Sequence, residues 1–305
     1  MQTPLVSAIV STYNSERFIR GCLEDLENQT IASELEIIVV DSGSEQNEGA
    51  IVQEFARRFP NIRYIRTSQR EGLYEAWNRA VTVARGKYLT NANTDDRHRA
   101  DAFQTLAQRL ESTPEAVLAY GDQIVSFVEN EPFDLCRANG GKLRPWPEYT
   151  AADLMLRCIT GSQPMWRSSV HDEHGLFSTR FRIAGDYEFW MRLAQTGQFV
   201  HVAEPLGVRF ESSDTLEYAN KWQCDMESLE IKKLYLDRAP WRQDRELPAR
   251  LAPELFIIGY RYIKRRERKH AMPFLLEAWK LDRLNLSYLK TLVLRGWMGV
   301  QARLE

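Results

Sequence analysis

Short apolar runs alternate with stretches of helical periodicity along the first hundred residues. Strands are predicted at 5–11, where the run is β-branched, and at 35–41, 61–67 and 87–92, the third near a sheet edge because it alternates. Between these runs apolar side chains recur every three or four positions, which predicts helices around Phe18, Ile51 and Trp77, the last ended by Gly86. Strands that alternate with helices in this way predict an α/β fold with a parallel sheet.

The pattern changes after residue 98. It predicts helices at 99–111, 151–158 and 184–197, extended segments at 116–128 and 199–210, and a loop at 130–150. From about 215 it predicts helices, with a proline-punctuated break at 240–253. We therefore expect a catalytic domain over 1–212, with halves of about 1–98 and 99–212, and a helical C-terminal region over 213–305.

Composition narrows the class of protein. The chain has 305 residues, of which 44% are hydrophobic, enough for a large core. The net charge of -2 gives no basic field for nucleic acid, so no nucleic-acid partner is expected. Four cysteines lie far apart without a C-x-x-C pair, which argues against a zinc site or a disulfide framework.

The charge is unevenly distributed. From residue 239 onward 14 Lys and Arg face 7 Asp and Glu, so this segment carries +7 and the rest of the chain -9. The basic run 261–270 among apolar residues at helical spacing is typical of a peripheral membrane contact. The alternatives are a helical subdomain packed on the catalytic body or a homodimer contact. Acids interrupt the basic face, and this favours these two alternatives over membrane contact.

The N-terminal residues and hydropathy bear on location. "MQTPLVSAIVSTYN" lacks a basic region followed by a long apolar region, and no run approaches the roughly 20 apolar residues of a spanning helix. We expect a cytoplasmic protein, with the inner face of the membrane as a peripheral location.

Polar clusters follow three of the predicted strands. They are Ser11–Asn14, Asp41–Ser44 and Asn93–Asp96. The carboxyl ends of parallel strands share one edge of the sheet, where ligands of such sheets bind. These clusters therefore predict a site there.

The stretch "LTNANTDD" places Asp95 and Asp96 side by side at the end of a predicted strand. Adjacent carboxylates repel each other unless a cation or solvent compensates. They could hold Mg²⁺ or Mn²⁺ together with substrate phosphates. The alternative is that one of them only caps the next helix.

Three other residues have two interpretations each. Asp41 could accept hydrogen bonds from a base or ribose, or close an Asx-turn. Tyr13 could stack on a base or belong to the core. Asp186 opens the helix in "AGDYEFWMRLAQTG" and could be a general base or an ordinary acid at a helix N-terminus. The chain has no G-x-G-x-x-G, Walker A or G-x-S-x-G motif, which argues against NAD enzymes, P-loop NTPases and serine hydrolases.

Several linked motifs resemble those of a known family. "VSAIVSTYN", "IIVVDSGS", "GLYEAWNRAVTVARGKYLTNANTDD" and "FRIAGDYEFWMRLAQTG" are similar, in this order, to the inverting family-2 glycosyltransferases, over residues 4–210. The resemblance implies a GT-A fold, that is, a Rossmann-like, mostly parallel sheet flanked by helices, here with a C-terminal helical extension. It also implies a nucleotide-sugar donor and Mn²⁺ or Mg²⁺.

The resemblance assigns roles by position. It implies that Asp95, with Asp96 beside it, binds the metal, and that Asp186 is the catalytic base. The residues it implies for the donor are Ser11, Tyr13, Asn14, Asp41, Ser42, Asn78, Arg79, Asn93 and Thr94. Three positions depart from the family pattern: Asn93 replaces the first acid of D-x-D, Gly185 replaces the first acid before the base, and Glu211 stands near the place of a histidine as the candidate third metal contact.

The function implied by the resemblance is inverting transfer of a sugar from a nucleotide-diphosphate sugar to an acceptor hydroxyl. UDP is the first choice of nucleotide, with GDP or dTDP as alternatives, and the acceptor is a sugar or a lipid-linked sugar. Polysaccharide, O-antigen or glycolipid biosynthesis would use such a reaction. The alternative is an inactive nucleotide-sugar-binding or scaffold protein with the same fold.

Overall fold

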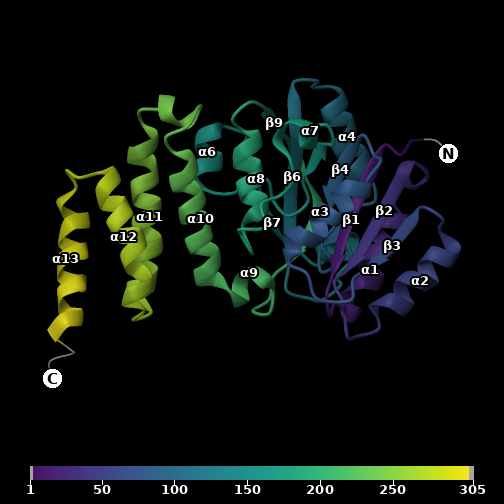
Figure 1. Cartoon of the computed structure of the whole chain (residues 1–305), viewed down its shortest axis with the longest axis horizontal. Coiled ribbons are helices and arrows are strands. Elements are labelled where there is room, and N and C mark those ends of the chain that lie inside the picture. The colour runs from purple at the N-terminus through teal and green to yellow at the C-terminus, as the bar shows by residue number, and fades with distance from the viewer. Residues whose placement is uncertain (1–2, 302–305) are drawn as a thin grey trace. The chain divides into compact units, whose positions relative to one another are not determined.

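The computed structural model describes residues 3–301, with side chains described up to residue 293. The chain divides into two compact units (Figure 1). The first comprises residues 1–149 and 159–221, and the second comprises residues 150–158 and 222–305. The domain boundary at 212/213 and the division into halves at 98/99 stay predictions.

The first unit is built on one mixed sheet. Its strands are β1 (Val6–Thr12), β2 (Leu35–Asp41), β3 (Ile62–Arg66), β4 (Tyr88–Asn91), β5 (Arg97–His98), β6 (Ala116–Ser126), β7 (Lys142–Arg144), β8 (Met165–Arg167) and β9 (Gln198–Phe210). Their order is β3-β2-β1-β4-β8-β6-β9-β5, with β7 paired to β6. Strands β1 to β4 are mutually parallel, β8 is antiparallel to both its neighbours, and β9 runs parallel to β6. The prediction of an α/β fold with a mostly parallel sheet is confirmed.

Helices cover both faces of the sheet. The helices assigned wholly to this unit are α1 (Glu16–Glu27), α2 (Glu48–Arg58), α3 (Leu73–Val83), α4 (Ala102–Glu111), α5 (Phe133–Ala138), α7 (Val170–His174), α8 (Gly185–Leu193) and α9 (Leu216–Ala219). Val6, Ala8 and Val10 join α1, α2 and α4 in one apolar cluster. Side chains alternate along a strand, so Ile9 faces the other side, where α3 contacts β1 and β2.

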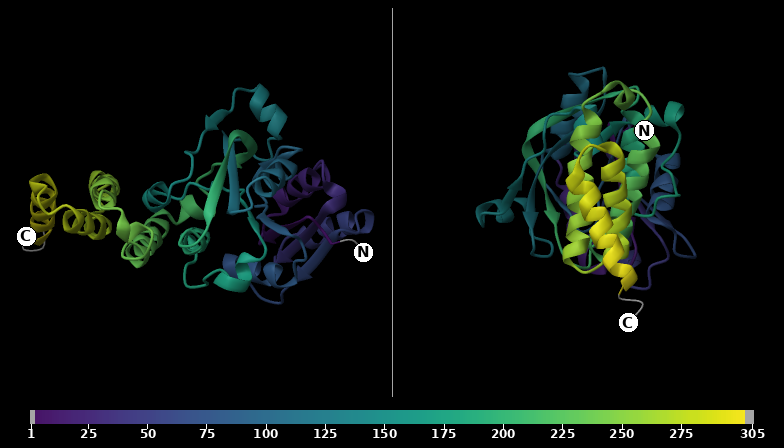
Figure 2. Two further views of the ribbon diagram at one scale, coloured as in Figure 1. Left: turned by 90° about the horizontal axis from the view of Figure 1, so that it is seen from above. Right: turned by 90° about the vertical axis from the view of Figure 1, so that its left-hand side faces the viewer.

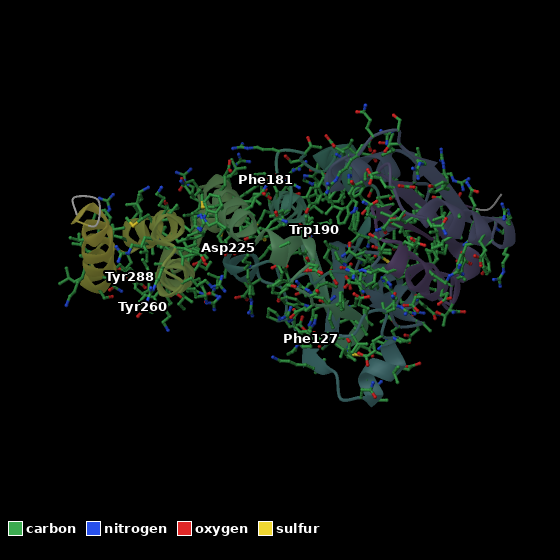
Figure 3. The ribbon with its side chains drawn as sticks, turned by 90° about the horizontal axis from the view of Figure 1, so that it is seen from below. Phe127, Phe181, Trp190, Asp225, Tyr260 and Tyr288 are labelled. Carbon is green, nitrogen blue, oxygen red and sulfur yellow. The ribbon has the colours of Figure 1, made fainter. Side chains whose placement is uncertain are left out.

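Burial explains the apolar runs. All seven residues of β2 are buried, as expected of a central parallel strand, whereas only Ile62 of β3 is buried. β3 ends the strand order, so its predicted place near an edge is confirmed. Phe127 follows β6 directly and is 73% exposed (Figure 3).

Five sequence-based expectations about element bounds are wrong. The segment 130–150 contains α5 and β7 rather than only loop, because β7 pairs with β6. The helix predicted at 99–111 begins at Ala102 and the strand predicted at 116–128 ends at Ser126. α3 ends at Val83 with Ala84 as its C-cap, so Gly86 does not end it. The break predicted at 240–253 ends earlier, because α11 starts at Leu247 and continues through Pro253.

The second unit is helical. It contains α6 (Ala151–Leu156), most of α10 (Lys221–Tyr235), α11 (Leu247–Lys264), α12 (Arg268–Leu281) and α13 (Leu286–Gln301). Figure 2 shows α11, α12 and α13 beside one another in sequence order. A Cβ at Gly259 would lie 2.8 Å from Leu275, so the glycine permits a close crossing of α11 and α12. The rings of Phe256 and Tyr288 lie 4.6 Å apart between α11 and α13.

Within the described residues, no helix has both the length and the apolar character required to cross a bilayer.

Candidate functional site

The parallel register brings the three predicted clusters to one edge of the sheet. Thr12 lies beside Asp41 across β1 and β2, and Ile9 lies beside Asn91 across β1 and β4. The loops that follow β1, β2 and β4 therefore leave the same edge, and the predicted convergence of these clusters follows from the register.

Asp41 is fully buried at the end of β2. Its Oδ2 accepts hydrogen bonds from the Tyr64 hydroxyl (2.5 Å) and Arg66 Nη1 (2.7 Å), and its Oδ1 accepts one from the Ser44 backbone N–H (2.8 Å). Burial alone would raise the pKa of Asp41, but the hydrogen bonds from Tyr64 and Ser44 and the Arg66 charge outweigh it and hold the pKa below its usual value. Asp41 thus orders the turn after β2, and contact with a nucleoside stays a prediction.

The turns after β1 and β2 bind each other. Asn14 has a φ of 51°, its backbone N–H donates to Ser44 Oγ (3.2 Å), and its Oδ1 accepts from Glu45 N–H (2.9 Å). Asparagine tolerates this left-handed conformation better than most residues. Ser42 is buried and donates its N–H to Thr12 O (3.0 Å).

Two other residues predicted to bind the nucleotide-sugar donor contact aromatic or cationic side chains. Ser11 Oγ accepts a hydrogen bond from Trp77 Nε1 (3.2 Å). The Arg70 guanidinium lies over the Tyr13 ring, 4.1 Å from its centroid, and Tyr13 is half-buried rather than part of the core.

Helix α3 anchors a distant segment. Asn78 Nδ2 donates to Phe177 O and Asn78 Oδ1 accepts from Phe177 N–H, both at 2.9 Å. Arg79 is paired with Glu71 near solvent. Asn78 therefore fixes the segment before α8, and donor contacts of Asn78 and Arg79 stay predictions.

The two adjacent carboxyls lie directly after β4. Asp96 is buried, with Oδ1 accepting from Phe210 N–H and Oδ2 from Asn93 Nδ2, both at 3.2 Å. Burial and the neighbouring Asp96 charge raise the pKa of Asp95 to about 7, and burial raises that of Asp96. Thr94 between Asn93 and Asp95 is buried.

Arg209, near the end of β9, is the principal cation here. Its Nη2 pairs with Glu217 Oε2 at 2.7 Å, and its charge acts on both Asp95 and Asp96. Glu211 Oε1 lies 2.9 Å from Arg144 Nη2 and 3.8 Å from Arg209 Nε. Glu211 is thus flanked by two cations, and its predicted contact with a metal stays a prediction.

Asp186 occupies the first turn of α8. Its Oδ1 accepts from the Tyr74 hydroxyl (2.9 Å) and from Tyr187 N–H (2.7 Å). Burial raises the pKa of Asp186 above its usual value against these hydrogen bonds, and the Glu217 charge adds to the rise. A carboxylate whose pKa is moved toward neutrality is better suited to accept a proton than an ordinary surface acid.

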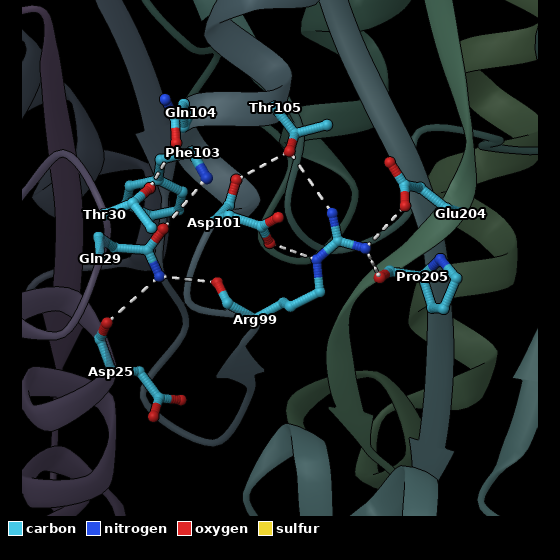
Figure 4. A network of polar contacts seen from close by, with 10 residues as sticks. All are labelled: Asp25, Gln29, Thr30, Arg99, Asp101, Phe103, Gln104, Thr105, Glu204 and Pro205. Atoms are coloured by element: carbon cyan, nitrogen blue, oxygen red, sulfur yellow. Dashed lines mark hydrogen bonds and ion pairs between the residues drawn. The ribbon is translucent and has the colours of Figure 1, made fainter.

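A polar network holds the chain just beyond Asp96 (Figure 4). Gln29 Nε2 donates to Arg99 O (2.9 Å), and its Oε1 accepts from Phe103 N–H (3.1 Å), which ties α1 to α4. Arg99 reaches Glu204 Oε2 (2.9 Å) and Pro205 O (3.0 Å) on β9. The carboxylate loop is therefore followed by a segment bound on both sides.

The resemblance implies a divalent cation at Asp95 and Asp96. Within the described residues, no group of three or more His, Cys, Asp or Glu side chains is placed to hold a metal. Two adjacent carboxyls, of which Asp96 raises the pKa of Asp95, nevertheless fit a hard cation, since Mg²⁺ is held by one or two carboxylates together with substrate phosphates.

Sequence reasoning missed two contributors. Glu217 pairs with Arg209 from α9, and Tyr74 on α3 contacts Asp186 from 112 positions away. Nothing local distinguishes either residue, because an acid in a helical turn and an aromatic on a helix are common. Only their long-range partners reveal them.

Comparisons with known proteins agree with this architecture. The model of the family described as "Glycosyl transferase family 2" matches residues 7–166, which is more than half of the chain. The chondroitin synthase of Escherichia coli is 27% identical over 201 residues, 66% of this chain, and the chain spans 28% of that protein's length.

Two solved structures share the fold. S. aureus TarS, in a complex with UDP-GlcNAc, has a TM-score of 0.70 at 16% identity, covering 92% of this chain and 83% of that chain. The mannosyltransferase PcManGT from Pyrobaculum calidifontis, in a complex with GDP-Man and Mn²⁺, has a TM-score of 0.65 at 16% identity, covering 99% of this chain and 86% of that chain. These likenesses show that the predicted GT-A fold is correct. With the family match, they show that the chain belongs to glycosyltransferase family 2.

Proposed function

We propose that this chain is a metal-dependent inverting glycosyltransferase that uses a nucleotide-diphosphate sugar. One observation carries the proposal. The Arg209 charge lowers the pKa of both Asp95 and Asp96, against the effect of burial. Glu217, the ion-pair partner of Arg209, raises the pKa of Asp186. Electrostatic effects weaken with distance, so the adjacent carboxyls and the candidate base belong to one region.

In this proposal Asp186 accepts the proton of an acceptor hydroxyl. The hydroxyl oxygen forms a bond to the anomeric carbon on the face opposite the nucleotide, and the bond from that carbon to the diphosphate breaks. Configuration is inverted, and the proton passes from Asp186 to solvent. One base suffices because no covalent glycosyl intermediate is formed.

Asp95 and Asp96 are the proposed holders of Mn²⁺ or Mg²⁺. Glu211, the proposed third contact, would have to leave its ion pair with Arg144 to reach the cation. When bound, such a cation supplies charge that neutralises a departing diphosphate. Asp96 already accepts hydrogen bonds from Asn93 and Phe210, so its proposed part is to fix the loop. Asp95 is then the carboxyl offered to the cation.

The donor is proposed to lie along the rim formed by the turns after β1 and β2. The nucleoside would be surrounded by Ser11, Tyr13, Asn14, Asp41 and Ser42. The diphosphate and sugar would lie nearer Asn78, Arg79, Asn93 and Thr94. UDP is proposed first because TarS was solved with UDP-GlcNAc, and GDP is the alternative because PcManGT was solved with GDP-Man. dTDP remains a third choice.

The acceptor is proposed to be a sugar or lipid-linked sugar in polysaccharide, O-antigen or glycolipid synthesis, supported by the likeness to a chondroitin synthase. We place this reaction in the cytoplasm. The C-terminal helices would make a peripheral contact with the inner face of the membrane or form a homodimer. The net positive charge of residues 239–305 supports contact with an anionic surface.

A thermal-shift panel tests the donor and the metal together. UDP, GDP and dTDP are each added with and without Mn²⁺, and the right nucleotide is expected to stabilise the chain by about 2.7 kcal/mol at 100 times its Kd. Asp95→Asn should remove the Mn²⁺-dependent part of the shift, whereas Asp134→Asn, on the exposed face of α5, should retain it.

The base is tested separately by Mn²⁺-dependent release of the diphosphate from the matching nucleotide sugar. Asp186→Asn should lower kcat by about 10²- to 10⁴-fold while the thermal shift persists. Failure of every nucleotide to bind would overturn the proposal. Binding without any turnover would instead identify the inactive scaffold, and an unchanged shift in Asp95→Asn would overturn the metal assignment.

A further inference from the structure

The Tyr74 side chain is enclosed between α3 and the start of α8. It is 2% exposed, and its hydroxyl lies 2.7 Å from Ile183 O and 2.9 Å from Asp186 Oδ1. A single hydroxyl proton is therefore shared by two acceptors that flank the first turn of α8. The contact joins the helix after β3 to the carboxyl proposed as the base.

The Tyr74 ring also occupies the space beside Gly185. A Cβ on Gly185 would lie 2.6 Å from both Cδ2 and Cε2 of that ring, closer than such atoms approach in real proteins. The ring is packed against Trp77, with centroids 5.5 Å apart, and against Phe177 at 6.0 Å. Tyr74 and a side chain at position 185 consequently exclude each other.

The resemblance to family-2 glycosyltransferases implies an acid at position 185, where this chain has glycine. We propose that Tyr74 is a positioning residue that substitutes for that acid: its ring fills the space at 185, and its hydroxyl holds one oxygen of Asp186 so that the other faces the acceptor. The inference rests on the proposed role of Asp186 as the base.

The division between the two carboxylate oxygens follows from the contacts. The Tyr74 hydroxyl and the Tyr187 N–H both donate to Oδ1. Both contacts hold Oδ1, and Oδ2 is the oxygen that we assign to the acceptor hydroxyl. An anchored Oδ1 restricts rotation of the carboxylate, and such orientation of a catalytic group contributes to rate.

Tyr74 stays a donor throughout the neutral range. Burial, followed by the Asp186 charge, raises the pKa of the Tyr74 hydroxyl well above its usual value. The groups facing Asp186 are Tyr74 from α3, which favours its ionised form, and Glu217 from α9, which opposes it. Removing the Tyr74 hydroxyl should therefore make Asp186 harder to ionise.

Tyr74→Phe tests the hydroxyl with the ring left in place. With the nucleotide sugar of whichever diphosphate stabilises the chain, kcat is expected to fall by about tenfold or more while KM for the donor stays the same. The acidic limb of the kcat–pH profile should move to higher pH, which a purely structural role would not cause. The control is Tyr88→Phe, a buried tyrosine whose hydroxyl lies 3.3 Å from Arg167 Nη1 at the opposite end of β4, and it should change neither quantity.

The ring is tested by a stability cycle at position 185. Gly185→Ala should destabilise the native protein but cost less in a Tyr74→Ala background, where the ring no longer obstructs a Cβ. Equal costs in both backgrounds would overturn the steric argument. If Tyr74→Phe leaves kcat and the acidic limb unchanged while Asp186→Asn abolishes turnover, the positioning role is wrong and the proposed function stands. If Asp186→Asn retains full turnover, the assignment of the base fails first.

Discussion

Removal of the Asp25 carboxylate should destabilise the first unit by more than any other single change at the edge of the sheet near Asp96. Asp25 accepts hydrogen bonds from Arg97 Nε and Nη2, both at 2.7 Å, and from His98 N–H at 2.8 Å. The side chains of Asp25 and Arg97 are only 13% and 8% exposed. In Asp25→Ala the guanidinium would keep the Asn130 carbonyl (2.6 Å) but lose its counter-charge.

Breaking a buried ion pair from one side costs about 3–5 kcal/mol, because the remaining charge is uncompensated. Replacing both partners with apolar residues of similar size, as in Asp25→Leu with Arg97→Met, should cost much less because no charge is then buried. The exposed pair of Arg17 and Glu129 is the matched control. It also begins on α1 and has a 2.7 Å contact, but its side chains are 53% and 46% exposed, so Glu129→Ala should cost no more than about 1 kcal/mol.

Native-state hydrogen exchange of the β1 and β2 amides measures the cost in the first unit directly, without assuming that both units unfold together. A loss of 3–5 kcal/mol lowers protection by about 10²- to 10³·⁵-fold, at 1.4 kcal/mol for each factor of ten. If Asp25→Ala reduces protection no more than Glu129→Ala does, the reasoning from burial is refuted.

Other predictions concern single contacts elsewhere. Gly86→Ala should lower stability by about 1–3 kcal/mol in urea unfolding, because its Cβ would lie 2.5 Å from the Ser7 backbone nitrogen, which cannot move aside; an unchanged midpoint would contradict this. Burial lowers the pKa of Lys232 to about 8, so between pH 8 and the unfolded value of 10.5 the unfolded state binds more protons and the stability of the second unit should rise with pH. Thermal unfolding of Lys232→Met over that range should lack this rise, and a persistent rise would assign it to other groups. Leu284 is 92% exposed, so Leu284→Ser should change the unfolding free energy by less than about 0.5 kcal/mol, and a larger loss would mean that this side chain is covered in solution.

Local pattern was sufficient where burial is uniform along an element. The strand predicted at 35–41 coincides with β2 because each of its residues is buried, so the apolar run and the strand end together. It failed at 130–150, where α5 and β7 are short and β7 depends on pairing with β6, a partner distant in the chain. A polar, proline-rich segment carries no local sign of such pairing.

The candidate site divides in the same way. The positions of Asp41, Asp95 and Asp186 at the ends of elements followed from the order of strands and helices. The hydrogen-bond partners of each carboxyl did not follow from that order. Asp41 is held by Tyr64 and Arg66, whereas burial and the Asp96 charge raise the pKa of Asp95.

The sequence by itself determined the family, the α/β fold with its mostly parallel sheet, and the edge at which polar loops gather, because these depend on periodicity and on motifs within short stretches. Only the tertiary structure decided that Tyr74 contacts Asp186 and excludes a side chain at 185, and that Glu217 neutralises Arg209. Those contacts join residues far apart in the chain, and their strength depends on burial, which no local pattern specifies.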